Sequence, residues 1–159
     1  MNRISFMKQT FGDAVPRLWC PLLTHFSAPG VPDEARMRRL MRSIAPSVGG
    51  ILVPGSTGEG WDMNDDNIQT VLEIVLTEAR NLGQHVLIGA LKPTAELTIE
   101  SIHRSLDLIR DMSGCNEPDA ALTELGVAGF TICPPTGAEL THVARASIVC
   151  MMAGSDFIK

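Results

Sequence analysis

The sequence contains no tyrosine, and its aromatic side chains come from only five phenylalanines and two tryptophans. Any mechanism that needs a tyrosine hydroxyl is therefore excluded within these 159 residues. Charged residues are also scarce, at 19% of the sequence, against about 25% in a typical soluble domain. The net charge of −5 argues against nucleic acid as a partner, because that binding depends on neutralising phosphates.

The four cysteines, Cys20, Cys115, Cys133 and Cys150, are far apart and form no CxxC pair. This spacing favours neither a disulfide scaffold nor a zinc site. The histidines also lack metal-ligand spacing, so no metal and no cofactor are predicted. No segment approaches the ~20 apolar residues of a membrane span, and the N-terminus has no signal-peptide core. These absences predict a cytoplasmic protein with free thiols and no membrane contact.

What the sequence does contain is enough apolar material for one core. Apolar residues make up 45% of the sequence, and the mean hydropathy is +0.14. Short apolar runs begin near residues 18, 50, 86 and 127, and each is followed by a segment with helical apolar spacing. Runs of this kind are typical of a parallel sheet that is buried on both faces. The pattern predicts an α/β fold with four βα units.

The number of units leaves two architectures open. A (β/α)₈ barrel needs eight units and about 250 residues. Four units therefore form either a complete open sheet or the first half of such a barrel.

Capping residues and apolar spacing predict how the helices lie. Asp33 and Asn64 are expected to cap the first two helices, Gly83 to end the second, and the third to begin near Thr94. The spacing predicts that the third helix buries one face, made of Ile99, Ile102, Leu106 and Ile109. Four arginines of the first helix are interpreted as its solvated face: Arg36, Arg38, Arg39 and Arg42.

The segment that carries most chemistry is Gly-Ser-Thr-Gly-Glu-Gly at residues 55–60, here called the signature turn, which follows the second strand. Gly55 and Gly58 allow the backbone to approach a ligand closely. Ser56 and Thr57 add hydroxyl donors to the N–H groups of the turn, which suits a carboxylate or a phosphate. The lysine of a P-loop and the spacing of a dinucleotide fingerprint are absent. The alternative is a tight βα turn whose hydroxyls bond only to local backbone.

The segments around this turn resemble the dihydrodipicolinate synthase / N-acetylneuraminate lyase family of pyruvate-handling class I aldolases. The resemblance covers about residues 18–148. It rests on residues 21–26, with His25 where proline is usual, and on the signature turn in its Ser-Thr form. Residues 71–75, 88–90 and 126–135 resemble the second helix, the third strand and the fourth strand with its proline.

The resemblance implies a single incomplete TIM-barrel domain over residues 1–159. Residues 1–17 would be an N-terminal extension, residues 18–152 four βα units, and residues 153–159 an irregular tail. It also implies a Schiff-base-forming lyase or aldolase that acts on pyruvate or a related 2-oxo acid. Ser56 and Thr57 would bind the carboxylate, and Thr57 would also join a proton relay. The remaining expected site residues are Gly55 and Gly58 in the turn, and Thr24, His25, Lys92 and Thr136 at the rim.

The departures from the family bear on activity. The family's Schiff-base lysine lies on the sixth strand and a relay tyrosine on the fifth, so this chain alone is expected to be inactive. A further tyrosine is replaced near Thr136. Lys92 precedes a proline in a loop and is interpreted as solvated. The alternative is a non-catalytic carboxylate-binding or regulatory half-barrel.

The outer strands of a half-barrel would have unpaired edges at residues 18–24 and 127–133. Exposed edges of this kind pair with other chains, so we expect the chain to form homo-oligomers.

Overall fold

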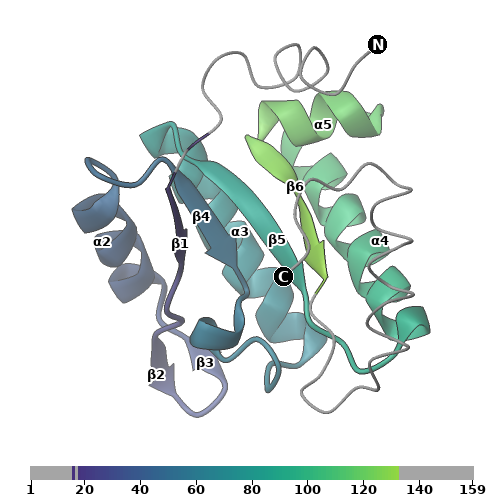
Figure 1. The fold of residues 1–159 in the computed structure, drawn as a ribbon, viewed down its shortest axis with the longest axis horizontal. Helices are drawn as coiled ribbons and strands as arrows, with labels where there is room; N and C mark the ends of the chain where they lie inside the picture. Colours follow the sequence, from purple (N-terminus) through teal and green to yellow (C-terminus); the bar gives the residue numbers. More distant parts are fainter. Residues whose placement is uncertain (1–15, 17, 133–159) are drawn as a thin grey trace.

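The computed structural model of this chain describes residue 16 and residues 18–132. Strands and helices alternate along this part of the chain (Figure 1). The strands are β1 (Trp19–Pro21), β2 (Phe26–Ala28), β3 (Val31–Pro32), β4 (Gly50–Val53), β5 (His85–Ala90) and β6 (Val127–Ile132). The helices are α2 (Glu34–Ile44), α3 (Asp65–Leu82), α4 (Ala95–Ser113) and α5 (Pro118–Glu124), with a 3₁₀ turn η1 (Ser56–Gly58).

Four of the strands form one parallel sheet in the order β1–β4–β5–β6. Trp19 pairs with Gly50 at one edge, and Val86 pairs with Val127 at the other. The four predicted strand starts and the α/β class with a parallel sheet are confirmed. β2 and β3 form a separate antiparallel hairpin. The sequence does not predict this hairpin, because its strands have only three and two residues.

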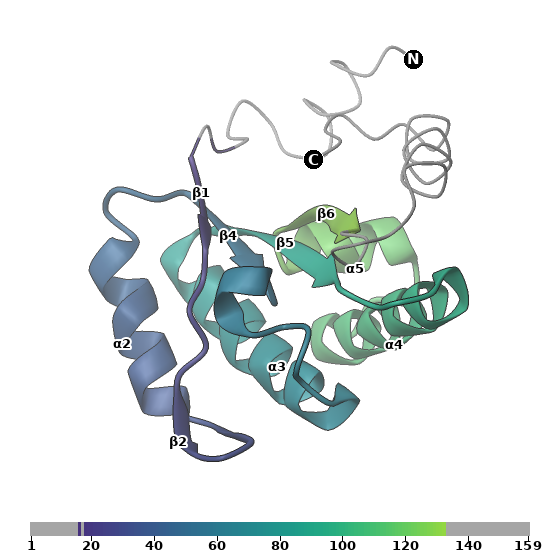
Figure 2. The ribbon, with the colours of Figure 1, turned by 60° about the horizontal axis from the view of Figure 1, so that its bottom comes forward.

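The described helices cover one face of the sheet. In Figure 2, α2, α3 and α4 lie along the same side of the four strands. Ile51, Val53 and Ile88 point to this side and are at most 1% exposed. Leu52 and Leu87 alternate with them, so they point to the opposite face, where they are only half-buried. Burial on both faces, as predicted from the apolar runs, is therefore wrong for the described part of the chain.

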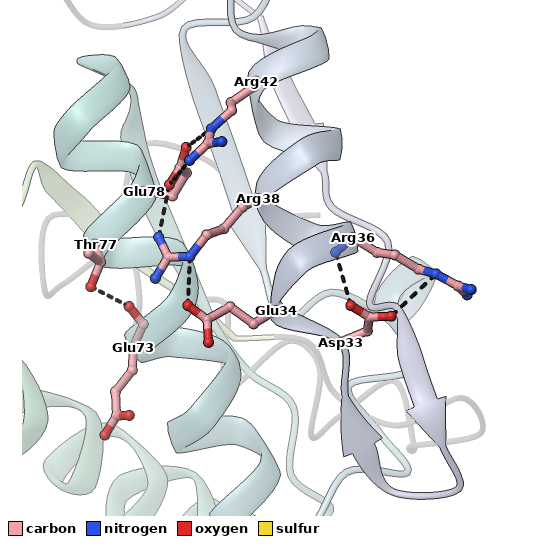
Figure 3. A network of polar contacts seen from close by, with 8 residues as sticks. All are labelled: Asp33, Glu34, Arg36, Arg38, Arg42, Glu73, Thr77 and Glu78. Carbon is pink, nitrogen blue, oxygen red and sulfur yellow. Dashed lines mark hydrogen bonds and ion pairs between the residues drawn. The ribbon is translucent and has the colours of Figure 1, made fainter.

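Helices α2 and α3 both contribute apolar side chains to the core. A buried carboxylate of α3 also joins them through polar contacts (Figure 3). Glu78 of α3 is only 2% exposed. Arg38 Nη1 donates to Glu78 Oε2 at 2.8 Å, and Arg42 Nε donates to Glu78 Oε1 at 2.6 Å. Arg38 therefore does not belong to a solvated face, whereas Arg36, Arg39 and Arg42 are exposed as predicted, Arg42 with its guanidinium bonded to Glu78. Local spacing could not reveal this, because the partner lies on another helix.

The buried face of α4 matches the prediction only at Ile109. It consists of Thr98, Ser101, Ser105 and Ile109, while Ile99 is 55% exposed. Thr98 Oγ1 donates to the Thr94 carbonyl, and Ser105 Oγ donates to the Ser101 carbonyl. These hydroxyls bond to their own helix, so they can be buried without leaving a polar atom unpaired.

The predicted capping residues are confirmed. Asp33 and Asn64 each accept the backbone N–H three residues further on, and Thr94 accepts the N–H of Leu97. Gly83 ends α3 with a φ of 67°. The predicted fourth-strand prolines, the last helical segment and the tail at residues 153–159 lie outside the described residues. Among residues 18–132, no helix is both long enough and apolar enough to cross a membrane.

Candidate functional site

The signature turn begins where β4 ends, at the carboxyl edge of the parallel sheet. The Gly55 carbonyl accepts hydrogen bonds from the N–H groups of Gly58 and Gly60, both at 3.0 Å. The Ser56 carbonyl accepts the N–H of Glu59 at 3.2 Å. These backbone bonds fix the turn, and the side chains of Ser56 and Thr57 remain exposed beside each other. Two adjacent hydroxyl groups are therefore available to a ligand.

The turn is seated on the end of β1 through Gly58. A Cβ atom at this position would lie 2.5 Å from the Leu22 carbonyl oxygen and 3.0 Å from Thr24 Oγ1. A residue without a Cβ is required for so close an approach. The structure thus gives Gly58 a packing role against the segment after β1, and the ligand approach expected of it stays a prediction.

Thr24 lies directly beneath this contact. Its Oγ1 is buried and has no hydrogen-bond partner among the described residues. Buried hydroxyl groups are usually paired, so Thr24 Oγ1 is an exception at the contact between the signature turn and the segment after β1. Thr24, one of the residues expected at the rim, thus packs against the signature turn.

The carboxyl end of β5 packs against the turn from the other side. A Cβ atom at Gly89 would lie 1.9 Å from the Pro54 carbonyl oxygen, immediately before the turn. A Cβ at Gly60 would lie 2.6 Å from Leu91 Cδ1. The signature turn is therefore held between the ends of β1 and β5, and its position depends on small residues at these contacts.

We expect Gly89→Ala to destabilise the fold by about 2–3 kcal/mol, because the Pro54 backbone must move to admit the new methyl group. Chemical denaturation measures the change. Gly114→Ala is the control, since its Cβ would meet nothing within 4 Å and only its φ of 70° is unfavourable. An effect of Gly89→Ala no larger than that of Gly114→Ala would contradict the close packing between β5 and Pro54.

Lys92 follows β5 and is not solvated, contrary to the prediction. Its side chain is 17% exposed, and Nζ lies 2.7 Å from Asp65 Oδ1. The other carboxylate oxygen of Asp65 accepts Arg104 Nη1 at 2.6 Å. The hydrogen bond from Lys92, with the charge of Arg104, holds the pKa of Asp65 below its ordinary value. These bonds join the start of α3 to the segment after β5 and to α4. The sequence does not show that these three segments are neighbours.

The other expected site residues lie in less informative positions. His25 is half-buried, and its carbonyl accepts the Asp33 N–H at 2.6 Å before α2 begins. Thr136 lies outside the described residues. Within residues 18–132, no group of three or more His, Cys, Asp or Glu side chains could hold a metal ion.

One residue of the site is missing from the sequence-based prediction. Trp61 follows the signature turn, and its Nε1 donates to Ser56 Oγ at 3.2 Å. The sequence signal that could have identified Trp61 is a tryptophan in a polar loop. A partly buried indole N–H usually needs a hydrogen-bond partner nearby.

The described residues define a parallel α/β fold with a hydroxyl-bearing turn at the carboxyl edge of its sheet, which is where proteins of this class place their ligand sites. Two solved structures share this fold. N-acetylneuraminate lyase from Fusobacterium nucleatum aligns with a TM-score of 0.59 at 16% identity, over 87% of this chain and 43% of the lyase. Dihydrodipicolinate synthase from Aquifex aeolicus aligns with a TM-score of 0.50 at 20% identity, over 72% of this chain and 33% of the synthase.

Both structures belong to the family that the sequence resembles, so the predicted resemblance is confirmed in the fold. The chain spans less than half the length of either protein. No protein-family model matches the sequence, and no curated protein matches it.

Proposed function

We propose that this chain is part of a Schiff-base-forming lyase or aldolase that acts on pyruvate or a related 2-oxo acid. Its four βα units form half of a (β/α)₈ barrel in this proposal, and the signature turn binds the substrate carboxylate. The observation that carries the proposal is the pair of exposed hydroxyls, Ser56 and Thr57, on a turn fixed at the carboxyl edge of the sheet. Active sites of such barrels lie at this edge.

The chemistry of the turn fits a carboxylate. A carboxylate only accepts hydrogen bonds, and the hydroxyl groups of Ser56 and Thr57 both donate them. Neither side chain carries a charge, so the turn binds the anion without neutralising it. Such a site holds the carboxylate in place while the adjacent keto carbon reacts with a group from outside the turn. Thr57 would be available to pass a proton.

The amine of the Schiff base is assigned to a lysine of the sixth barrel strand, outside these four βα units. Lys92 is the lysine within them, and its ammonium group is engaged by Asp65. This engagement also favours the second candidate function, in which the chain binds a carboxylate without catalysis.

Pyruvate titration by calorimetry tests the proposal. Ser56→Ala and Thr57→Val are each expected to weaken binding by about ten- to a hundredfold, because a hydrogen bond to a charged group contributes about 1.5–3 kcal/mol. Thr70→Val is the matched control, since Thr70 is an exposed threonine of α3. Binding that all three variants retain would remove the signature turn from the site.

The same samples, treated with pyruvate and borohydride, are expected to keep their mass. A reduced adduct at Lys92 would instead give the catalytic amine to this chain.

A further inference from the structure

The contact between Trp61 and Ser56 constrains the hydroxyl that faces the ligand. Trp61 Nε1 lies 3.2 Å from Ser56 Oγ, across the signature turn. An indole N–H can only donate, so Ser56 Oγ must be the acceptor in this bond. A serine hydroxyl carries a single proton. With one lone pair occupied by the indole, that proton points away from Trp61 and is free to donate.

The indole itself is held in place by the backbone around it. The Gly60 N–H donates to the Gly55 carbonyl, and the Asp62 N–H donates to the Glu59 carbonyl, both at 3.0 Å. Trp61 lies between these two bonds and is half-buried, whereas Ser56 is exposed. The indole of Trp61 is therefore the fixed partner of this bond, and the hydroxyl proton of Ser56 is the group that rotates to suit it.

We propose that Trp61 is a positioning residue that biases Ser56 toward donating its hydrogen bond, so that the signature turn prefers a carboxylate to a neutral amide. This inference rests on the proposed function. A carboxylate oxygen accepts the Ser56 proton whichever way it is presented. An amide NH₂ group needs an acceptor, and Ser56 has only one of its two lone pairs left beside the indole bond, so it accepts less readily. No such indole bond constrains the Thr57 hydroxyl in the described structure, which leaves Thr57 able both to donate and to accept.

Nuclear magnetic resonance of the indole N–H groups provides the test. The chain has two tryptophans, so it gives two indole resonances, and Trp61→Phe identifies which one belongs to Trp61. Ser56→Ala is expected to shift the Trp61 resonance, because it removes the acceptor. Pyruvate is expected to shift the same resonance in the unaltered chain, and pyruvamide to bind more weakly.

Trp61→Phe keeps an aromatic ring and removes only the N–H and part of the indole. We expect it to weaken pyruvate binding by about three- to tenfold, the value of one ordinary hydrogen bond. It should also narrow the preference for pyruvate over pyruvamide, since Ser56 can then accept through either of its lone pairs. Combined with Ser56→Ala, it should add no further loss, because both changes break the same bond.

The outcomes separate the two proposals. If pyruvate binds and Ser56→Ala weakens it, but Trp61→Phe changes neither affinity nor preference, the inference about Trp61 is wrong and the proposed function stands. If Ser56→Ala moves the Trp61 resonance but pyruvate neither moves it nor binds, the proposed function is wrong. If neither indole resonance moves on Ser56→Ala, the inference is overturned without any need for the Trp61 variant to fold.

Discussion

Replacing both Arg38 and Arg42 with methionine is expected to destabilise the fold by about 3–5 kcal/mol, because it leaves the Glu78 carboxylate buried without a partner. Glu78 is 2% exposed, and both of its oxygens accept hydrogen bonds from these two arginines. A typical domain is stable by only 5–15 kcal/mol, so a loss of this size removes much of the margin. Chemical denaturation at neutral pH measures it.

The opposite replacement is expected to be mild. Glu78→Met fills the site with an apolar side chain of similar length, and exchanges of a buried ion pair for apolar groups are often neutral. Of the arginines that it leaves behind, Arg42 already has a side chain that is 64% exposed, and Arg38, at 21%, keeps its bond to Glu34. A large loss of stability in the double arginine variant and a small one in Glu78→Met would show that the desolvation of Glu78 controls the energetics of this network.

The pH dependence of stability should have opposite signs in the unaltered chain and in the variant that lacks both arginines. In the unaltered chain the hydrogen bond from Arg42, followed by that from Arg38, lowers the pKa of Glu78 from 4.5. Its contribution is therefore present above pH 4.5 and is lost as the pH falls through the lowered pKa. Without the arginines, burial raises the pKa of Glu78, so the variant should gain stability on acidification.

Arg36→Met with Arg39→Met is the matched control. It makes the same charge change on the same helix, but both side chains are exposed, and exposed ion pairs contribute about 1 kcal/mol at most. Equal losses in the two double variants would show that the net charge of α2, and not the burial of Glu78, sets the effect.

The features that the sequence predicts correctly are those that local chemistry determines. Asp33 and Asn64 cap helices through side-chain bonds to residues three positions away. Gly83 ends α3 because its φ of 67° suits a residue without a Cβ. The four sheet strands are apolar runs bounded by polar turns. Each of these signals lies within a few residues of the element that it specifies.

The features that the sequence does not predict depend on contacts between distant segments. Glu78 lies 40 residues beyond Arg38, and Asp65 lies 27 residues before Lys92. Ser105 reads as a surface residue until its bond to the Ser101 carbonyl is seen. The signature turn itself is recognisable from its letters. Its seating on Leu22 and Thr24, and the indole bond to Ser56, follow only from how β1 and the loop meet.

Association is the second large effect that we expect. Within the described residues, β1 and β6 are the two edges of a parallel sheet whose second face is only partly covered. Leu23 follows β1 and is 48% exposed, and Ile132 at the end of β6 is 41% exposed. Unprotected edges of this kind pair with other strands. We therefore expect the 159-residue polypeptide to be dimeric or larger in solution.

A closed ring of two copies is geometrically possible. Rotation by a twofold axis along the barrel leaves the direction of every strand unchanged, so β6 of one copy can pair in parallel with β1 of the other. The second junction follows by symmetry, and the ring has eight strands. Both signature turns would lie at the same end of this barrel, since each follows the carboxyl end of its own β4.

Lysines at the two junctions should prevent this pairing. Leu23→Lys with Ile132→Lys places like charges at the carboxyl ends of both edges, which meet at each junction when the strands are parallel. We expect light scattering after size exclusion to give at least twice the 17.1 kDa of one chain for the unaltered protein, and a much smaller associated fraction for this variant. Val31→Lys with Ile99→Lys is the control, because these side chains are 51% and 55% exposed but lie on the hairpin and on α4. An unaltered protein that is a cooperatively unfolding monomer of 17.1 kDa would instead mean that the four strands form a complete open sheet.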